Sequence, residues 1–316
     1  MKTLIYPVFL PMQGCTHRCI YCDQNKISGA DSLNIEKELV GAARFVANHA
    51  HTPKEIAFYG GSFTALSSQF RLELTDRFTA VIDDCTSFRI STHPLYINDT
   101  ILAECKAQNI QCIELGIQDF CTEVLMASGR SYNTATAIKA AKLVMQKGFT
   151  LGIQLMPGLP ASSETTITLN RQILARLMPN YLRIYPLIVL KGTPLAELYV
   201  RGDYTPLQME EAISICADYA EFADQTGIRL IKTGLPSNLN AEDVLAGPYH
   251  PAFGEFVLAE RLIRLIVAKL TAKQEIILDK KQRYLIMSHR GRFVDCLKKR
   301  LENCSLNPEE VNRLLS

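Results

Sequence analysis

Three cysteines near the start of the chain are the residues best suited to chemistry. Cys15, Cys19 and Cys22 are separated by three and then two residues, and an aromatic residue, Tyr21, stands just before the last one. Such short spacings allow one loop to surround an iron–sulfur cube, whose usual ligands are cysteine thiolates. Because a cube with four irons needs four ligands, this loop would leave one iron open to a molecule other than the protein.

Two other interpretations of these cysteines are weaker. A structural zinc ion usually has four protein ligands in two separated pairs, and His17 lies too close in sequence to complete a tetrahedron easily. A lipoprotein signal would place Gly14–Cys15 after a continuous apolar run, but Pro7 and Pro11 interrupt a very short one. The cluster interpretation is therefore favoured.

The bulk composition is that of a globular protein. The chain has 316 residues, of which 47% are hydrophobic and 21% charged, enough for one large and one small domain. No apolar stretch is long enough to cross a membrane, and no secretion signal precedes the ten cysteines. Thiols in such a chain are expected to stay reduced. We therefore expect a cytoplasmic protein without a membrane partner.

The charge is unevenly distributed along the chain. Residues 261–316 carry 13 Lys and Arg against 6 Asp and Glu, whereas the first 260 residues carry 21 against 26. A basic end on a slightly acidic body favours an anionic partner for that end. A pair of solvated basic helices is the alternative.

Short β-rich runs alternate with helical patterns over the first 190 residues. We expect strands at 4–10, 55–59, 88–92, 111–118, 149–155 and 181–188, and helices at 35–49, 67–83, 99–108, 134–147 and 164–177. The alternation predicts a parallel sheet, which crossovers of one hand curl toward a barrel. Since six units are fewer than the eight of a closed barrel, the predicted fold is α/β, a partial (β/α)6 TIM-like barrel.

The pattern changes after residue 205. We expect a core at 1–205, with the cysteine loop at 15–22, and a small α+β C-terminal domain at 206–316, of which 272–316 is basic. This second domain should contain helices at 207–225 and 253–270, short strands at 229–232 and 275–278, and two or three basic helices.

Polar motifs stand where the predicted strands end, which is where parallel α/β folds bind their ligands. The cysteine loop follows the first strand, and the remaining motifs follow or end the other five. They are Gly60-Gly61-Ser62, Ser91-Thr92, Gln118, Gln154 and Tyr185.

With these motifs, the chain resembles the radical S-adenosylmethionine (SAM) superfamily over roughly residues 4–190. The resemblance implies a [4Fe-4S] cluster on the three cysteines, with SAM bound to the open iron and the backbone of Tyr21 touching its adenine. It also implies that Gly60, Gly61 and Ser62 contact the SAM amino group, where glycine permits close backbone approach. Further implied SAM contacts, several of them to the ribose and carboxylate, are Phe9, Ser91, Gln118, Arg130, Gln154 and Tyr185. For Arg130 a surface salt bridge is an equal alternative.

Four segments, 58–64, 116–118, 128–130 and 156–160, point to two subgroups. They resemble the radical-SAM half of the Elongator catalytic subunit, which modifies the wobble uridine of tRNA, and oxygen-independent coproporphyrinogen oxidase. Residues 245–254 are similar to stand-alone bacterial members of the Elongator-like branch.

The chain also departs from these relatives. Where they read Thr-Arg-Pro-Asp, it has Thr-His-Pro-Leu at 92–95, and where they tend to read Gly-Arg-Gly-His, it has Gly-Arg-Ser-Tyr at 129–132. Because arginine and histidine are not equivalent anion holders, the relatives' substrate chemistry is not carried over. With no acetyltransferase-like segment after the barrel, we do not expect the acetyl-CoA-dependent Elongator reaction.

The basic end faintly resembles the RNA-gripping part of a KH domain, in which a Gly-x-x-Gly turn between two helices clamps the backbone. Here Ser288 replaces the first glycine of that turn. The candidate phosphate contacts are Lys280, Lys281, Arg283, Arg290, Arg292, Lys298, Lys299 and Arg300.

Taken together, these features predict an enzyme that cleaves SAM to a 5′-deoxyadenosyl radical, which abstracts hydrogen from a substrate. A flavodoxin- or ferredoxin-type reductant would supply the electron, and tRNA is the favoured substrate. One alternative is a small-molecule radical SAM oxidase of the porphyrinogen kind. The other is a non-catalytic protein whose cluster serves structure, SAM or haem binding, while its tail binds RNA.

Overall fold

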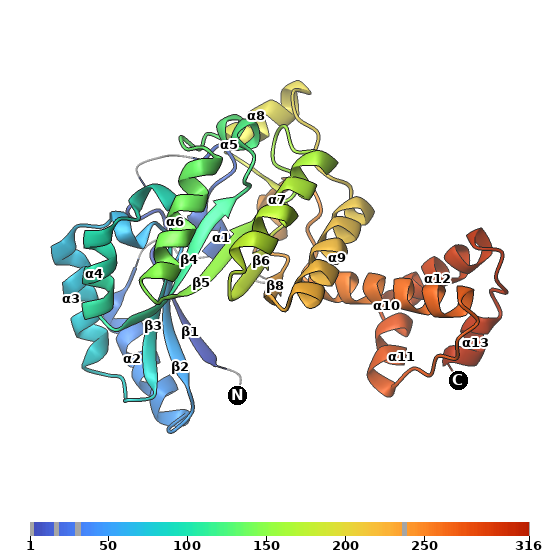
Figure 1. Ribbon diagram of the computed structural model, residues 1–316, viewed down its shortest axis with the longest axis horizontal. Coiled ribbons are helices and arrows are strands. Elements are labelled where there is room, and N and C mark those ends of the chain that lie inside the picture. The colour runs from blue at the N-terminus through green and yellow to red at the C-terminus, as the bar shows by residue number, and fades with distance from the viewer. Residues whose placement is uncertain (1–2, 16–18, 29–32, 236–238, 316) are drawn as a thin grey trace.

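The architecture is a curled parallel sheet with helices on its outer face and a helical extension at the C-terminal end (Figure 1). The structure is a computed structural model that describes residues 3–15, 19–28, 33–235 and 239–315. His17, considered above as a zinc ligand, lies outside these residues. The partial barrel predicted from the sequence is confirmed.

Seven parallel strands form the sheet in the order β1-β2-β3-β4-β5-β6-β8. All seven lie where the sequence pattern placed strands, to within a few residues. The strands are β1 (Leu4–Phe9), β2 (Lys54–Tyr59), β3 (Thr86–Thr92), β4 (Ile110–Gln118), β5 (Thr150–Leu155), β6 (Tyr181–Ile184) and β8 (Arg229–Thr233).

Five helices that cover the outer face begin in the same way. In each, an Asn or Ser side chain at the N-cap accepts a hydrogen bond from a backbone N–H of the first turn, which would otherwise lack a partner. These helices are α2 (Ile35–Asn48), α3 (Ser68–Thr79), α4 (Asp99–Ala107), α6 (Thr134–Gln146) and α7 (Glu164–Leu177). A longer helix, α9 (Met209–Thr226), precedes the last strand.

The sheet continues past the boundary that we expected at residue 205. Strand β8 pairs in parallel with β6, with Arg229 opposite Tyr181. The sixth expected strand is shorter than predicted, because Pro186 cannot donate to a ladder and β6 stops at Ile184. The chain resumes as β7 (Val189–Leu190), which pairs antiparallel with β9 (Val244–Ala246).

Described residues beyond 252 are helical or irregular. The elements are α10 (Phe253–Thr271), α11 (Lys280–Met287), the 3-10 turn η4 (His289–Gly291), α12 (Arg292–Asn303) and α13 (Glu310–Leu315). The strand expected at 275–278 was wrong: this segment is irregular and pairs with no other strand. Only part of it is anchored, since Leu278 is buried while Ile277 is 82% exposed. The strand on which the KH resemblance partly rested is therefore not formed by residues 275–278.

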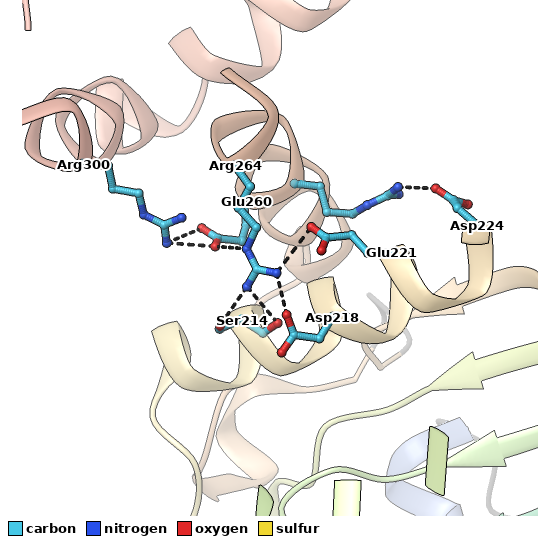
Figure 2. Close-up of polar contacts among 8 residues, drawn as sticks. Ser214, Asp218, Glu221, Asp224, Glu260, Arg264 and Arg300 are labelled. Atoms are coloured by element: carbon cyan, nitrogen blue, oxygen red, sulfur yellow. Dashed lines mark hydrogen bonds and ion pairs between the residues drawn. The ribbon is translucent and has the colours of Figure 1, made fainter. Parts of the chain in front are cut away.

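Ion pairs fasten this helical end to the barrel, as Figure 2 shows. Arg264 on α10 donates to Asp218 Oδ1 at 2.5 Å, to Ser214 Oγ at 2.8 Å, both on α9, and to Glu260 Oε1 at 2.7 Å. Arg300 on α12 donates to both oxygens of Glu260, at 2.8 and 2.9 Å. Buried Glu260 therefore links α12 through α10 to α9.

The inside of the barrel is charged. Glu114 on β4 accepts hydrogen bonds from Arg89 on β3 at 2.5 Å and from Arg183 on β6 at 2.7 Å. Arg89 also donates to Glu55 on β2 at 2.7 Å, and the Tyr59 hydroxyl donates to Glu114 at 3.1 Å. The two carboxylates and two guanidiniums balance in charge, which the desolvated interior requires.

Removing one of these charges should destabilise the fold strongly. We expect Glu114→Gln to lower the free energy of unfolding by about 3–5 kcal/mol, since it leaves two buried guanidiniums without their shared carboxylate. Guanidinium chloride denaturation measures the difference. The matched control is Glu36→Gln, which removes a surface partner of Arg77 and should cost at most about 1 kcal/mol. Equal small losses in the two variants would contradict this account.

Candidate active site

A cavity of about 530 Å3 opens at the carboxyl ends of the strands. The three cysteines line it together with all the residues that the sequence predicted around SAM. Those residues are Phe9, Tyr21, Gly60, Gly61, Ser62, Ser91, Gln118, Arg130, Gln154 and Tyr185. Residues from six strands and their following loops, far apart in sequence, are thus brought together.

Two loops hold the first cysteine in place by direct backbone contact. Met12 N donates to Gly60 O at 3.0 Å, and Ser62 N donates to Gln13 O at 2.9 Å. A Cβ at Gly61 would lie 2.2 Å from Gln13 O, and one at Gly14 would lie 2.3 Å from Ser62 O. Glycine at these positions is therefore required by the neighbouring backbone, a reason distinct from the ligand approach expected from the sequence.

The second half of the cysteine loop is fastened to two helices. Ile20 N donates to Ser128 O at 3.2 Å, at the end of α5 (Thr122–Ala127), and Leu195 N in α8 (Pro194–Arg201) donates to Ile20 O at 2.9 Å. Around Ile20 the chain makes a tight turn, which is closed by a hydrogen bond from Cys22 N to Cys19 O at 3.1 Å. The loop is thus fixed at both of its described ends.

Polar side chains adjoin the thiols. Cys15 Sγ lies 3.5 Å from Ser62 Oγ, and Cys19 Sγ accepts a hydrogen bond from Arg130 Nη1 at 3.2 Å. Donors of this kind stabilise thiolate ligands. Within the described ranges no three His, Cys, Asp or Glu side chains converge closely enough to hold a single metal ion. Three thiols around one cavity, each from a different point of the loop, fit a multi-iron cluster better than a lone ion.

The third cysteine, Cys22, has a polar neighbour of its own. Its Sγ accepts from Gln24 Nε2 at 3.6 Å, and burial together with the neighbouring Cys19 raises the pKa of its thiol to about 12. An uncharged thiol is therefore favoured at this position until a positively charged partner binds beside it.

A bulge at the end of β4 directs two glutamines toward each other. The register between β4 and β5 shifts at Gly116–Gln118, and Gln118 adopts a positive φ of 71°. Its Oε1 accepts from Gln154 Nε2 at 3.0 Å. Bulges and sparsely populated backbone conformations of this kind are common where a side chain must be re-aimed at a site.

Arg130 lies under the cavity and not on the surface. Its residue is only 4% exposed, so the surface salt bridge considered above is wrong. Its donors are directed to Cys19, Tyr21 and Tyr132 side chains and to the carbonyl of Gly116.

Sequence reasoning missed several polar residues of the cavity, among them Tyr59, Glu114 and Arg183. Arg183 Nη2 donates to Tyr59 OH at 2.8 Å, and Arg183 Nη1 donates to Tyr185 OH at 3.1 Å. The sequence did carry a signal for two of them, because Glu114 and Arg183 are charged residues inside strands β4 and β6, which otherwise read as buried.

The two departures from the relatives' motifs meet in space. The rings of His93 and Tyr132 lie 4.9 Å apart and edge to face, and both residues are buried. They are separated by 39 positions in the sequence, so the contact could not be read from either motif alone.

Comparison with known families agrees with this geometry. The family model of the radical SAM superfamily matches residues 9–169, and that of the radical SAM C-terminal domain matches residues 179–264. The chain belongs to the radical SAM superfamily. It is therefore a radical SAM enzyme, and the cofactors of its family are a [4Fe-4S] cluster and SAM.

Relatives of this radical SAM enzyme include a tRNA uridine(34) acetyltransferase of Methanocaldococcus infernus, 32% identical over 134 residues. The match covers 42% of this chain and 25% of the relative, so the chain spans only a quarter of that protein's length. Among solved structures, an N-terminally truncated archaeal Elp3 of Methanocaldococcus infernus has a TM-score of 0.67 at 19% identity, covering 88% of this chain and 69% of the other.

A second similar structure is coproporphyrinogen III oxidase (HemN) of Escherichia coli. Its TM-score is 0.52 at 17% identity, and the match covers 72% of this chain and 54% of the oxidase. At these identities both solved structures establish the shared fold. In the part of the chain that the structure describes, the helices are too short or too polar to span a bilayer.

The backbone contact at Gly61 gives a direct test of how the loop is held. We expect Gly61→Ala to push residues 12–15 away, because its Cβ would overlap Gln13 O, and to cost about 1–3 kcal/mol. Because Cys15 moves with this segment, the iron content of Gly61→Ala after anaerobic reconstitution should fall below that of the wild type.

The control for this variant is Gly227→Ala, at the end of α9, where a Cβ meets nothing within 4 Å but φ is +75°. It should lower the melting temperature and leave the iron content at the wild-type level. Full iron content in Gly61→Ala would show that the loop does not depend on this contact.

Proposed function

We propose that Cys15, Cys19 and Cys22 ligate the [4Fe-4S] cluster, that the adjoining cavity binds SAM, and that the substrate is tRNA. The observation that carries the first two parts is the convergence of the three thiols and ten predicted SAM residues on one cavity. When bound and reduced by one electron, the cluster and SAM together supply the 5′-deoxyadenosyl radical characteristic of the family.

In this proposal the chain's own residues bind and orient SAM, and they shield the site from water. Gly60, Gly61 and Ser62 line the cavity, where the Ser62 hydroxyl offers a hydrogen bond beside Cys15, and the Gln118–Gln154 pair offers amides across it. Met156 and Leu187 contribute apolar wall and keep water from a reactive intermediate. Holding one C–H bond within reach is then mainly a matter of position. A flavodoxin- or ferredoxin-type protein is the proposed electron donor.

None of the ten cysteines forms a disulfide. Free thiols suit a reducing cytoplasm, which is where we propose that the enzyme works.

Support for an RNA substrate comes from the similarity to a tRNA uridine(34) acetyltransferase and from the basic helices. Two of the eight predicted phosphate contacts are engaged in ion pairs, Arg292 with Glu210 and Arg300 with Glu260. The other six form no ion pair with the described carboxylates, and their charges stay available to a polyanion. They are Lys280, Lys281, Arg283, Arg290, Lys298 and Lys299.

A second candidate substrate is a small molecule with an apolar body and an anionic group. Part of the cavity is lined by Ile27, Ile188, Leu190 and Leu235, and the exposed Lys232 also lines it. An apolar cavity with a basic rim is what a porphyrinogen-like substrate would need.

Release of 5′-deoxyadenosine by the anaerobically reconstituted protein, with SAM and a strong reductant, separates these functions. We expect release that rises when bulk tRNA is added. Release that is indifferent to tRNA would move the proposal to small molecules. No release, from protein shown to hold a cluster, would contradict the proposed catalytic role of the cavity.

Matched variants tie the tRNA effect to the basic helices. The triple variant K280A/K281A/R283A should weaken tRNA binding and make its salt dependence less steep, by up to about one unit of slope for each phosphate that is no longer neutralised. The control K139A/K142A removes two exposed lysines from α6, on the barrel, and should leave tRNA binding nearly unchanged. Equal weakening in both variants would contradict a defined RNA surface on α11.

A further inference from the structure

The guanidinium of Arg130 has almost no donor left for a ligand. Nη1 donates to Cys19 Sγ at 3.2 Å and to Tyr21 OH at 3.1 Å, Nε donates to Tyr132 OH at 3.0 Å, and Nη2 donates to Gly116 O. An arginine has five N–H donors, so one remains. The forked pair of donors that grips a carboxylate is therefore not open, in contrast to the role implied by the resemblance.

The side chain is also held rigidly in this position. Its Cζ lies 5.1 Å from the centre of the Tyr132 ring, and Tyr132 OH donates to Ile117 O at 2.6 Å. Tyr132 also packs edge to face against His93. The backbone adds a further anchor, since Arg130 N donates to Leu125 O at 2.9 Å. The residue is 4% exposed, so solvent screens its charge poorly.

Arg130 forms no ion pair with a carboxylate in the part of the chain that the structure describes. Among the described residues that line the cavity, Glu114 is the only carboxylate, and it is already paired with Arg89 and Arg183. A fixed positive charge that donates a hydrogen bond to a cluster thiolate favours the more negative, reduced state of that cluster. Net charge, hydrogen bonds to sulfur and solvent exposure are the means by which proteins set cluster potentials.

We propose that Arg130 is a positioning residue that raises the reduction potential of the cluster through Cys19, and that its main partner is the thiolate and not the SAM carboxylate. The proposal rests on the proposed function, because it requires Cys19 to be a cluster ligand. Tyr132, which differs from the histidine usual in relatives, serves to hold the guanidinium against the cysteine loop.

The test is a redox titration of the reconstituted cluster followed by electron paramagnetic resonance, in the absence of SAM. Iron and sulfide content are measured first. We expect Arg130→Gln to shift the midpoint potential to more negative values, and Arg130→Lys to shift it less because the charge remains. Tyr132→Phe, which frees Nε but keeps the guanidinium, should give a small shift in the same direction.

Arg183→Lys is the matched control. This arginine lines the same cavity and is mostly buried, but its nitrogens bond Glu114, Tyr59 and Tyr185 and no thiol. Its substitution should leave the midpoint potential unchanged. In parallel, equilibrium dialysis of SAM should give dissociation constants within a few-fold of wild type for Arg130→Lys.

The outcomes are distinguishable. Unshifted potentials in Arg130→Lys and Tyr132→Phe, with SAM binding weakened tenfold or more in Arg130→Lys, would overturn the inference in favour of the carboxylate role. If only Arg130→Gln loses the cluster, the midpoint potentials of Arg130→Lys and Tyr132→Phe decide between the two roles. A wild-type protein that takes up no iron and sulfide would instead contradict the proposed function itself.

Discussion

The close approach of two backbone segments, residues 12–15 and 60–62, is the constraint on which the site depends. Gly61 and Gly14 leave room for carbonyl oxygens of the opposite segment, and the reciprocal hydrogen bonds fix the distance between the ends of β1 and β2. Because Cys15 follows Gly14 directly, its thiol is placed beside Ser62 by this backbone contact. The other end of the loop is set independently, by α5 and α8 at Ile20.

The interior of the barrel follows a second constraint, that of charge balance. Glu55, Arg89, Glu114 and Arg183 cancel one another inside a sheet where an unpaired charge would cost several kcal/mol. The base of the cavity is thus polar but neutral. The surplus positive charge of the site comes from Arg130 beside the thiols and from Lys232 among the cavity-lining residues. This distribution suits a site that must stabilise thiolates at one end and admit an anionic group at another.

Much of this was predictable from local patterns. The spacing of Cys15, Cys19 and Cys22 indicates a cluster loop because ligand spacing is a property of a few consecutive residues. The strand and helix bounds follow from alternating hydrophobic runs and from caps such as Asn34 and Ser163. The carboxyl ends of parallel strands meet at one edge, so the residues of the cavity could be grouped before their distances were known.

The remainder depends on contacts between distant residues. Glu114 meets Arg183 across 69 positions, and Tyr132 meets His93 only after the barrel has curled. Strand β8 reads as a weak, short pattern and joins the sheet because β6 offers it an edge. The segment 275–278 reads as a similar pattern and finds no edge, so it remains irregular.

The central claim is that the cysteine loop holds a cluster with one iron open to SAM. The most direct measurement is the electron paramagnetic resonance spectrum of the reduced, reconstituted protein before and after SAM is added. A changed spectrum in the wild type, together with loss of the signal in Cys15→Ala, Cys19→Ala and Cys22→Ala, is the result expected. A cluster signal that SAM leaves unaltered, or that survives in these variants, would contradict the claim.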